Sequence, residues 1–157
     1  MTKIQIPQKY IPKSLNKKDQ QTQKRCIQKS RKMYLSNKYI NRPFVKSFKS
    51  KKSSHVQKAT TLYQVESMNP NKTLGKKTKC SVEALKQIIK KGEGAYYSSG
   101  SRPNQTAQSW AYARLASSLT GGPASQVDYS ILKKGCQSKS IALRMANQTK
   151  KNKKVKK

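Results

Sequence analysis

Few residues in this 157-residue chain can carry acid–base chemistry. The chain has one histidine, His55, and five scattered acidic residues: Asp19, Glu66, Glu83, Glu93 and Asp128. A hydrolase or transferase relies on positioned groups that take and give protons, and histidine is the commonest of them. His55 lies in a basic segment near Ser54 and Lys58, where contact with solvent or a phosphate is favoured over general-base catalysis. We therefore predict a protein that is not an enzyme and has no catalytic residue.

The three cysteines could serve as nucleophiles or metal ligands, but their arrangement favours neither role. Cys26, Cys80 and Cys136 are an odd number at wide spacing, which argues against a disulfide framework and indicates a reducing compartment. No paired Cys or His residues accompany them, so we expect no metal site. The glycines after residue 91 lack the spacing and the preceding strand of a phosphate-binding glycine motif, so we expect no cofactor.

The most distinctive cluster of side chains lies in residues 95–106. Tyr96 and Tyr97 could stack on bases, and Arg102 offers a forked donor that suits phosphate. The serines of this segment could bond phosphate or backbone: Ser98, Ser99 and Ser101. We predict a site for nucleic acid or a protein partner that includes Tyr96, Tyr97, Ser99 and Arg102.

The same segment also has a purely structural interpretation. Ser, Gly and Pro are common in turns for conformational reasons. The tyrosines could belong to the core, and Arg102 could pair with Asp128 or with the C-terminus of a helix. Arg114, one helical turn after Trp110, could stack on that ring or direct its charge toward the loop, so it is also a candidate binding residue.

Charge is the largest imbalance in the composition. Lys and Arg total 36 against five acids, a formal net charge of +31, which attracts phosphate polymers or anionic surfaces. Residues 1–79 hold 21 of the basic residues, and the last eight residues hold six lysines. We predict nucleic acid, with DNA as the first candidate, as a partner. The expected contacts are cations of these two regions: Lys17, Lys18, Arg25, Arg31, Lys32, Lys49, Lys51, Lys52, Lys153 and Lys154.

Helical spacing and capping residues predict a mainly α protein. Residues 1–79 read as an extended, lysine-rich arm with a helix over residues 17–34, capped by Ser14 or Asn16, and a short helix after Ser53 or Ser54. No run approaches a membrane span, and the first ten residues lack the apolar core of a secretory signal.

Residues 80–147 read as a small helical domain. Four helices are expected there: Ser81 to Gly92, Thr106 to Gly121, Ser125 to Gly135 with Asp128 completing a capping box, and a short one from Ile141 to Met145. The segment between the first two is expected to form a structured loop. Residues 148–157 are expected to be a disordered tail because their charges repel one another.

A long motif gives the chain a recognisable pattern. It begins with GAYYSSGSRPNQT at Gly94, continues as SWA at Ser109 and ARLAS at Ala113, and ends with Gly121-Gly122 and VDY at Val127. In this motif the chain resembles an uncharacterised domain family encoded by large double-stranded DNA viruses, notably algal viruses and mimivirus relatives. The N-terminal half is similar to longer members of that group. The resemblance implies a viral context and brings no activity with it.

The leading hypothesis is therefore a basic structural protein of the virion, either a minor capsid protein or an internal component. The lysine-rich arm would contact capsid proteins or packaged DNA, and the protein would pass through the host cytoplasm or nucleus during assembly. The alternative is a nucleic-acid-binding protein that condenses or processes the genome. Two further alternatives are a ribosomal-type protein and an enzyme that acts through residues 96–102.

Overall fold

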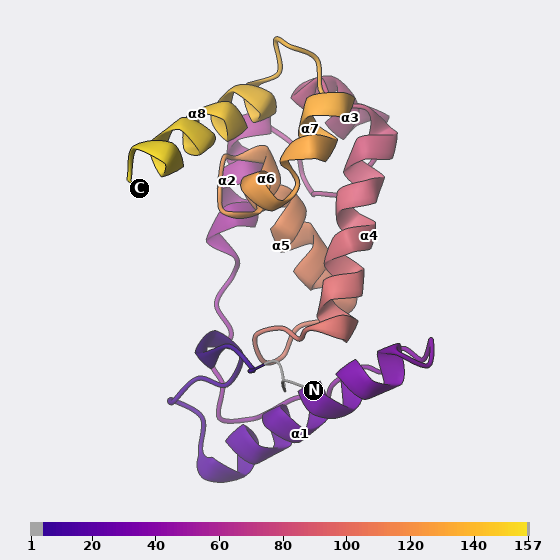
Figure 1. Ribbon diagram of the computed structural model, residues 1–157, viewed down its shortest axis with the longest axis vertical. Helices are drawn as coiled ribbons and strands as arrows, with labels where there is room; N and C mark the ends of the chain where they lie inside the picture. The colour runs from indigo at the N-terminus through magenta and orange to yellow at the C-terminus, as the bar shows by residue number, and fades with distance from the viewer. Residues whose placement is uncertain (1–4, 157) are drawn as a thin grey trace. The chain divides into compact units, whose positions relative to one another are not determined.

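A computed structural model describes residues 5–156, and their regular secondary structure is helical apart from one isolated bridge. The prediction of a mainly α protein is confirmed. Figure 1 labels the α-helices. The helical elements are η1 (Gln8–Tyr10), α1 (Lys17–Tyr34), α2 (Ser54–Tyr63), α3 (Lys72–Thr78), α4 (Val82–Ser98), α5 (Ala107–Leu119), α6 (Ala124–Val127), α7 (Tyr129–Gly135) and α8 (Ile141–Val155).

The chain forms two compact units that do not follow the order of the sequence. The first unit combines the residues up to 51 with residues 93–110, and the second combines residues 52–92 with residues 111–157. The expected division into an arm ending at residue 79 and a domain over 80–147 does not coincide with these units. The physical reason is that residues 93–110 provide the packing partner that α1 lacks on its own.

Local capping residues explain where several helices begin. The Asn16 side chain accepts a hydrogen bond from the backbone N–H of Asp19 at the start of α1, and Ser53 does the same for Val56 at the start of α2. Thr106 and Ser109 exchange side-chain-to-backbone hydrogen bonds at the start of α5. These three helix starts are confirmed because each depends on residues within one turn. Helix α3 was not predicted.

Gly92 does not end a helix, which corrects the expectation for residues 81–92. Helix α4 continues to Ser98. A Cβ atom on Gly92 would lie 2.7 Å from the Cα atom of Ala111, so the glycine permits a close approach to α5. The structured loop is consequently shorter than expected and begins near Ser99.

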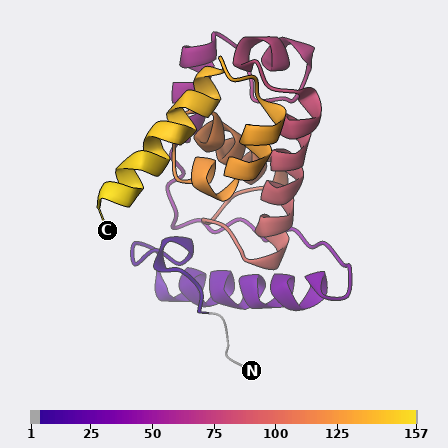
Figure 2. The same cartoon turned by 45° about the horizontal axis from the view of Figure 1, so that its top comes forward.

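In the second unit, α6 and α7 contact each other and α8 (Figure 1). The core there is formed by aliphatic side chains that are fully buried: Leu85, Ile88, Leu115, Leu119 and Leu132. Residues 148–155 belong to α8, where a disordered tail was expected, and the last turns of this helix project from the unit (Figure 2). Lysine is a good helix former, and Lys153 and Lys154 lie favourably at the negative end of the helix dipole.

The cysteines also differ from expectation. Cys80 and Cys136 form a disulfide, and Cys26 is a free thiol. The two half-cystines face each other across a short antiparallel bridge, flanked by backbone hydrogen bonds from Ser81 to Gly135 and from Gln137 to Lys79. This is the position at which opposite side chains come closest. The interpretation of unpaired cysteines is wrong for this pair because count and spacing do not reveal such a bridge.

Candidate functional site

Helix α1 presents a cationic face on the side away from its buried stripe. The buried residues are Gln23, Ile27 and Ser30, which recur at helical spacing. The opposite side carries four exposed cations: Lys18, Arg25, Lys29 and Lys32. At 1.5 Å per residue these cations extend over about 21 Å of the helix axis. We call these four residues the α1 cationic face.

The only acid of α1 does not neutralise this face. Asp19 accepts hydrogen bonds from the backbone N–H and the hydroxyl of Ser47. These bonds hold the pKa of the Asp19 carboxyl below its usual range, with Lys18 acting in the same direction. The carboxylate thus fastens the segment that follows α1 to the start of the helix. Among residues 5–156, no cation of the α1 cationic face forms a salt bridge.

The buried side of α1 is fixed to the end of α4 and the turn after it by polar contacts. Gln23 donates to the carbonyl of Ser101 at 3.2 Å, and Ser30 donates to the carbonyl of Tyr97 at 2.9 Å. Gly100 adopts a φ of +127°, and a side chain there would press against Ile27. These contacts give α1 a firm support, so its exposed cations point consistently to solvent.

Tyr96 is a core residue, which corrects its assignment as a base-stacking ring. It belongs to α4 and is 1% exposed. Its hydroxyl donates to the carbonyl of Gln105 at 3.0 Å. One face of its ring is covered by the guanidinium carbon of Arg42 at 3.7 Å from the ring centre. No face of this ring is available to a base.

Tyr97 is partly exposed and belongs to a group of four aromatic rings, in which Tyr96 packs edge-on against it. Its ring centre lies 5.2 Å from that of Tyr39, which is 61% exposed and lies 5.9 Å from Tyr34. Burial raises the pKa of the Tyr97 phenol, and the neighbouring Tyr96 and Glu93 act in the same direction. Tyr39 was missed by the sequence reasoning, although an exposed tyrosine beside a basic helix suits base stacking.

Ser99 and Arg102 are both exposed at the turn after α4, as a binding role requires. The Ser99 carbonyl accepts a hydrogen bond from the Nε of Arg31 at 2.8 Å. Arg102 does not pair with Asp128, because the Asp128 carboxylate is bound by Arg114. Three of the four predicted loop residues, Tyr97, Ser99 and Arg102, therefore remain candidates for contact with a ligand.

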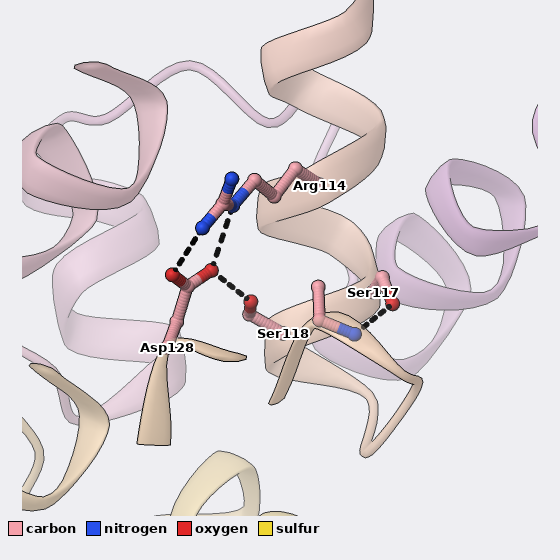
Figure 3. A network of polar contacts seen from close by, with 5 residues as sticks. Arg114, Ser117, Ser118 and Asp128 are labelled. Carbon is pink, nitrogen blue, oxygen red and sulfur yellow. Dashed lines mark hydrogen bonds and ion pairs between the residues drawn. The ribbon is translucent and has the colours of Figure 1, made fainter. Parts of the chain in front are cut away.

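Arg114 has a structural role that neither predicted alternative described (Figure 3). Its Nε and one terminal nitrogen donate to the two carboxylate oxygens of Asp128 at 3.0 and 2.7 Å. Ser118 donates to the same carboxylate at 2.9 Å, and Asp128 is fully buried. Asp128 therefore does not complete a capping box, and the expected single helix divides into α6 and α7 around it. Arg114 is withdrawn from the candidate binding residues.

The remaining predicted cations are exposed and lie outside the α1 cationic face. Lys17 lies at the first position of α1, Lys49, Lys51 and Lys52 lie in the segment before α2, and the pair Lys153 and Lys154 lies in α8. Among residues 5–156, no helix is long and apolar enough to cross a membrane. The same residues contain no group of three or more His, Cys, Asp or Glu side chains arranged to hold a metal ion.

The fold and surface define a class of protein, a small, mainly helical and strongly basic protein with a cationic helix face. Residues 7–127 match the model of a family of unknown function, DUF5824, and because the match covers well over half of the chain, the chain belongs to this family. No curated protein matches the chain. No solved structure matches it either.

Proposed function

We propose that this protein is a non-enzymatic structural protein that binds the backbone of duplex DNA. In the viral context that the sequence resemblance implies, it is an internal component of the virion that contacts packaged DNA. The observation that carries the proposal is the α1 cationic face, in which Lys18, Arg25, Lys29 and Lys32 project from a helix supported along its other side.

The physical basis is the release of counterions from DNA. Duplex DNA carries about one negative charge per 1.7 Å of its axis, so a helix face about 21 Å long meets several phosphates at once. Each phosphate that is neutralised contributes about −0.9 to the slope of log K against log salt. Four contacts from the α1 cationic face therefore contribute about −3.6 to that slope. Such contacts carry no sequence information, which suits a packaging role.

The test is a salt titration of duplex binding measured by fluorescence anisotropy. In the test variant, all four residues of the α1 cationic face are replaced by Gln, which is a good helix former. The control variant replaces four exposed lysines of the second unit by Gln: Lys58, Lys72, Lys76 and Lys86. Both variants lose the same net charge.

We expect the test variant to lose affinity and to flatten the salt slope by about 3.6, whereas the control retains most of the slope. Equal loss in both variants would show that net charge alone drives binding and would contradict the role of the α1 face. The virion component of the proposal is tested by quantifying the protein in purified particles before and after DNA is removed. Loss together with the DNA supports it, retention in emptied shells favours contact with capsid proteins, and absence from intact particles refutes it.

A further inference from the structure

Three arginines from separate segments of the first unit meet at the turn of residues 99–102. Arg31 comes from the last turns of α1, and its Nε donates to the carbonyl of Ser99 at 2.8 Å. Arg42 comes from the segment after α1, and one of its terminal nitrogens donates to the hydroxyl of Ser101 at 2.7 Å. Arg102 follows Ser101 in the turn itself and is exposed. Residues far apart in the sequence thus place the guanidinium groups of Arg31 and Arg42 against a turn that carries a third arginine, Arg102.

Tyr10 packs against the same turn, because a Cβ atom on Gly100 would lie 3.2 Å from the Cδ2 atom of the Tyr10 ring. Burial raises the pKa of the Tyr10 phenol, and Arg31, Arg42 and Arg102 all act against that rise.

Arg42 is held firmly although its partners carry no charge. It donates to the carbonyl of Tyr96 at 2.8 Å and to the hydroxyl of Ser30 at 3.3 Å, and it stacks on the Tyr96 ring. Burial lowers the pKa of this guanidinium, a sign that water has been partly removed from the cation. A desolvated charge that meets only neutral groups keeps its attraction for an anion.

The carboxylates of the first unit do not supply that anion. The acids in it are Asp19 and Glu93. Asp19 is bound by Ser47, and Glu93 lies near the phenol of Tyr97. Neither Arg42 nor Arg102 forms an ion pair within residues 5–156. The turn therefore combines the fixed positive charge of Arg42 with the exposed forked donors of Arg102, and a guanidinium fork suits phosphate oxygens well.

We propose that the turn of residues 99–102, together with Arg31 and Arg42, binds one phosphate of a nucleic acid backbone. This inference rests on the proposed function and assigns it a defined anion site apart from the α1 cationic face. The turn is held against α1 through Gln23 and the packing of Gly100, so the site is formed before the ligand arrives. Arg42, which was not a predicted binding residue, becomes its fixed cation.

The test uses three variants of the full-length protein. Arg102→Gln removes an exposed guanidinium without disturbing buried contacts, and Arg102→Lys keeps the charge but removes the fork. Arg144→Gln, an exposed site on α8, is the matched control. Duplex binding is measured against salt, and the backbone amide resonances of residues 99–102 are followed by NMR during titration with a short duplex and, separately, with inorganic phosphate.

We expect Arg102→Gln to flatten the salt slope by about 0.9, Arg102→Lys to recover most of that slope, and Arg144→Gln to have no effect. The amides of the turn should shift on addition of the duplex. If parent and Arg102→Gln bind with the same slope while replacement of the α1 cationic face weakens binding, the phosphate site is refuted and the proposed function stands. If no variant changes binding, both are refuted. Shifts with inorganic phosphate but not with duplex would overturn the assignment to a nucleic acid backbone.

Discussion

The buried ion pair of the second unit allows a sharp test of the fold. In Asp128→Asn the side chain keeps its shape but loses its charge and one of its acceptor oxygens. The native carboxylate accepts two hydrogen bonds from Arg114 and one from Ser118, and it is fully buried. The variant therefore leaves a guanidinium that is 19% exposed without a counter-charge.

Removing one partner of a buried ion pair costs about 3–5 kcal/mol, because the remaining charge is left desolvated. This is a large part of the total stability of a typical domain, which is about 5–15 kcal/mol. We expect urea unfolding followed by circular dichroism to show a midpoint lowered by about 1–3 M, given typical slopes for small proteins. Glu83→Gln, at an exposed position on α4, should change the unfolding free energy by less than about 0.5 kcal/mol.

A double replacement separates the pair from its surroundings. If Arg114→Met is combined with Asp128→Asn, no unpaired charge remains, and part of the lost stability should return. If the free energy of unfolding of Asp128→Asn lies within about 1 kcal/mol of that of the parent protein, the reasoning is refuted. The Asp128 carboxylate would then not be the counter-charge of a desolvated arginine.

Three further predictions follow from single contacts. Tyr63→Phe should lower stability by about 1–3 kcal/mol because the last carbonyl of α5 loses its buried donor. Burial raises the pKa of Tyr63, so the contribution of its neutral phenol to the free energy of unfolding is fully present below about pH 10 and is lost as the pH rises further. The loss of stability at alkaline pH should therefore be smaller in Tyr63→Phe than in the parent protein. Gly92→Ala should lower the melting temperature through a backbone clash that costs about 1–3 kcal/mol, whereas Gly94→Ala, with no atom closer than 3.6 Å, should not. Thiol titration of the unfolded, unreduced protein should count one thiol out of three cysteines. Reduction of the bond between Cys80 and Cys136, which are 56 residues apart, should cost about 4 kcal/mol.

Features that depend on neighbouring residues were predictable from the sequence. The helices that begin after Asn16, Ser53 and Thr106 were expected from their capping side chains, which act within one turn. The excess of positive charge was equally predictable, because it is a property of composition, and with it the expectation of a polyanionic partner.

The roles of individual site residues depend on contacts between distant segments. Tyr96 and Tyr97 are adjacent and chemically identical, yet only Tyr96 is buried beneath Arg42. Arg102 and Arg114 are chemically identical, yet only Arg114 has a buried carboxylate partner, contributed from beyond the end of α5. No local pattern distinguishes these cases.

The sequence by itself determined that this protein is mainly helical, strongly positive and poor in catalytic groups. Tertiary structure alone decided which cations remain exposed, that Gly92 permits close packing where a helix end was expected, and that Arg31, Arg42 and Arg102 share one turn. The reason is physical. Helix formation and net charge arise from short-range and additive effects. Burial, pairing and convergence require segments far apart in the sequence to meet, as Gln23 and Ser101 do across 78 residues, and their free energies depend on the partner that each side chain finds there.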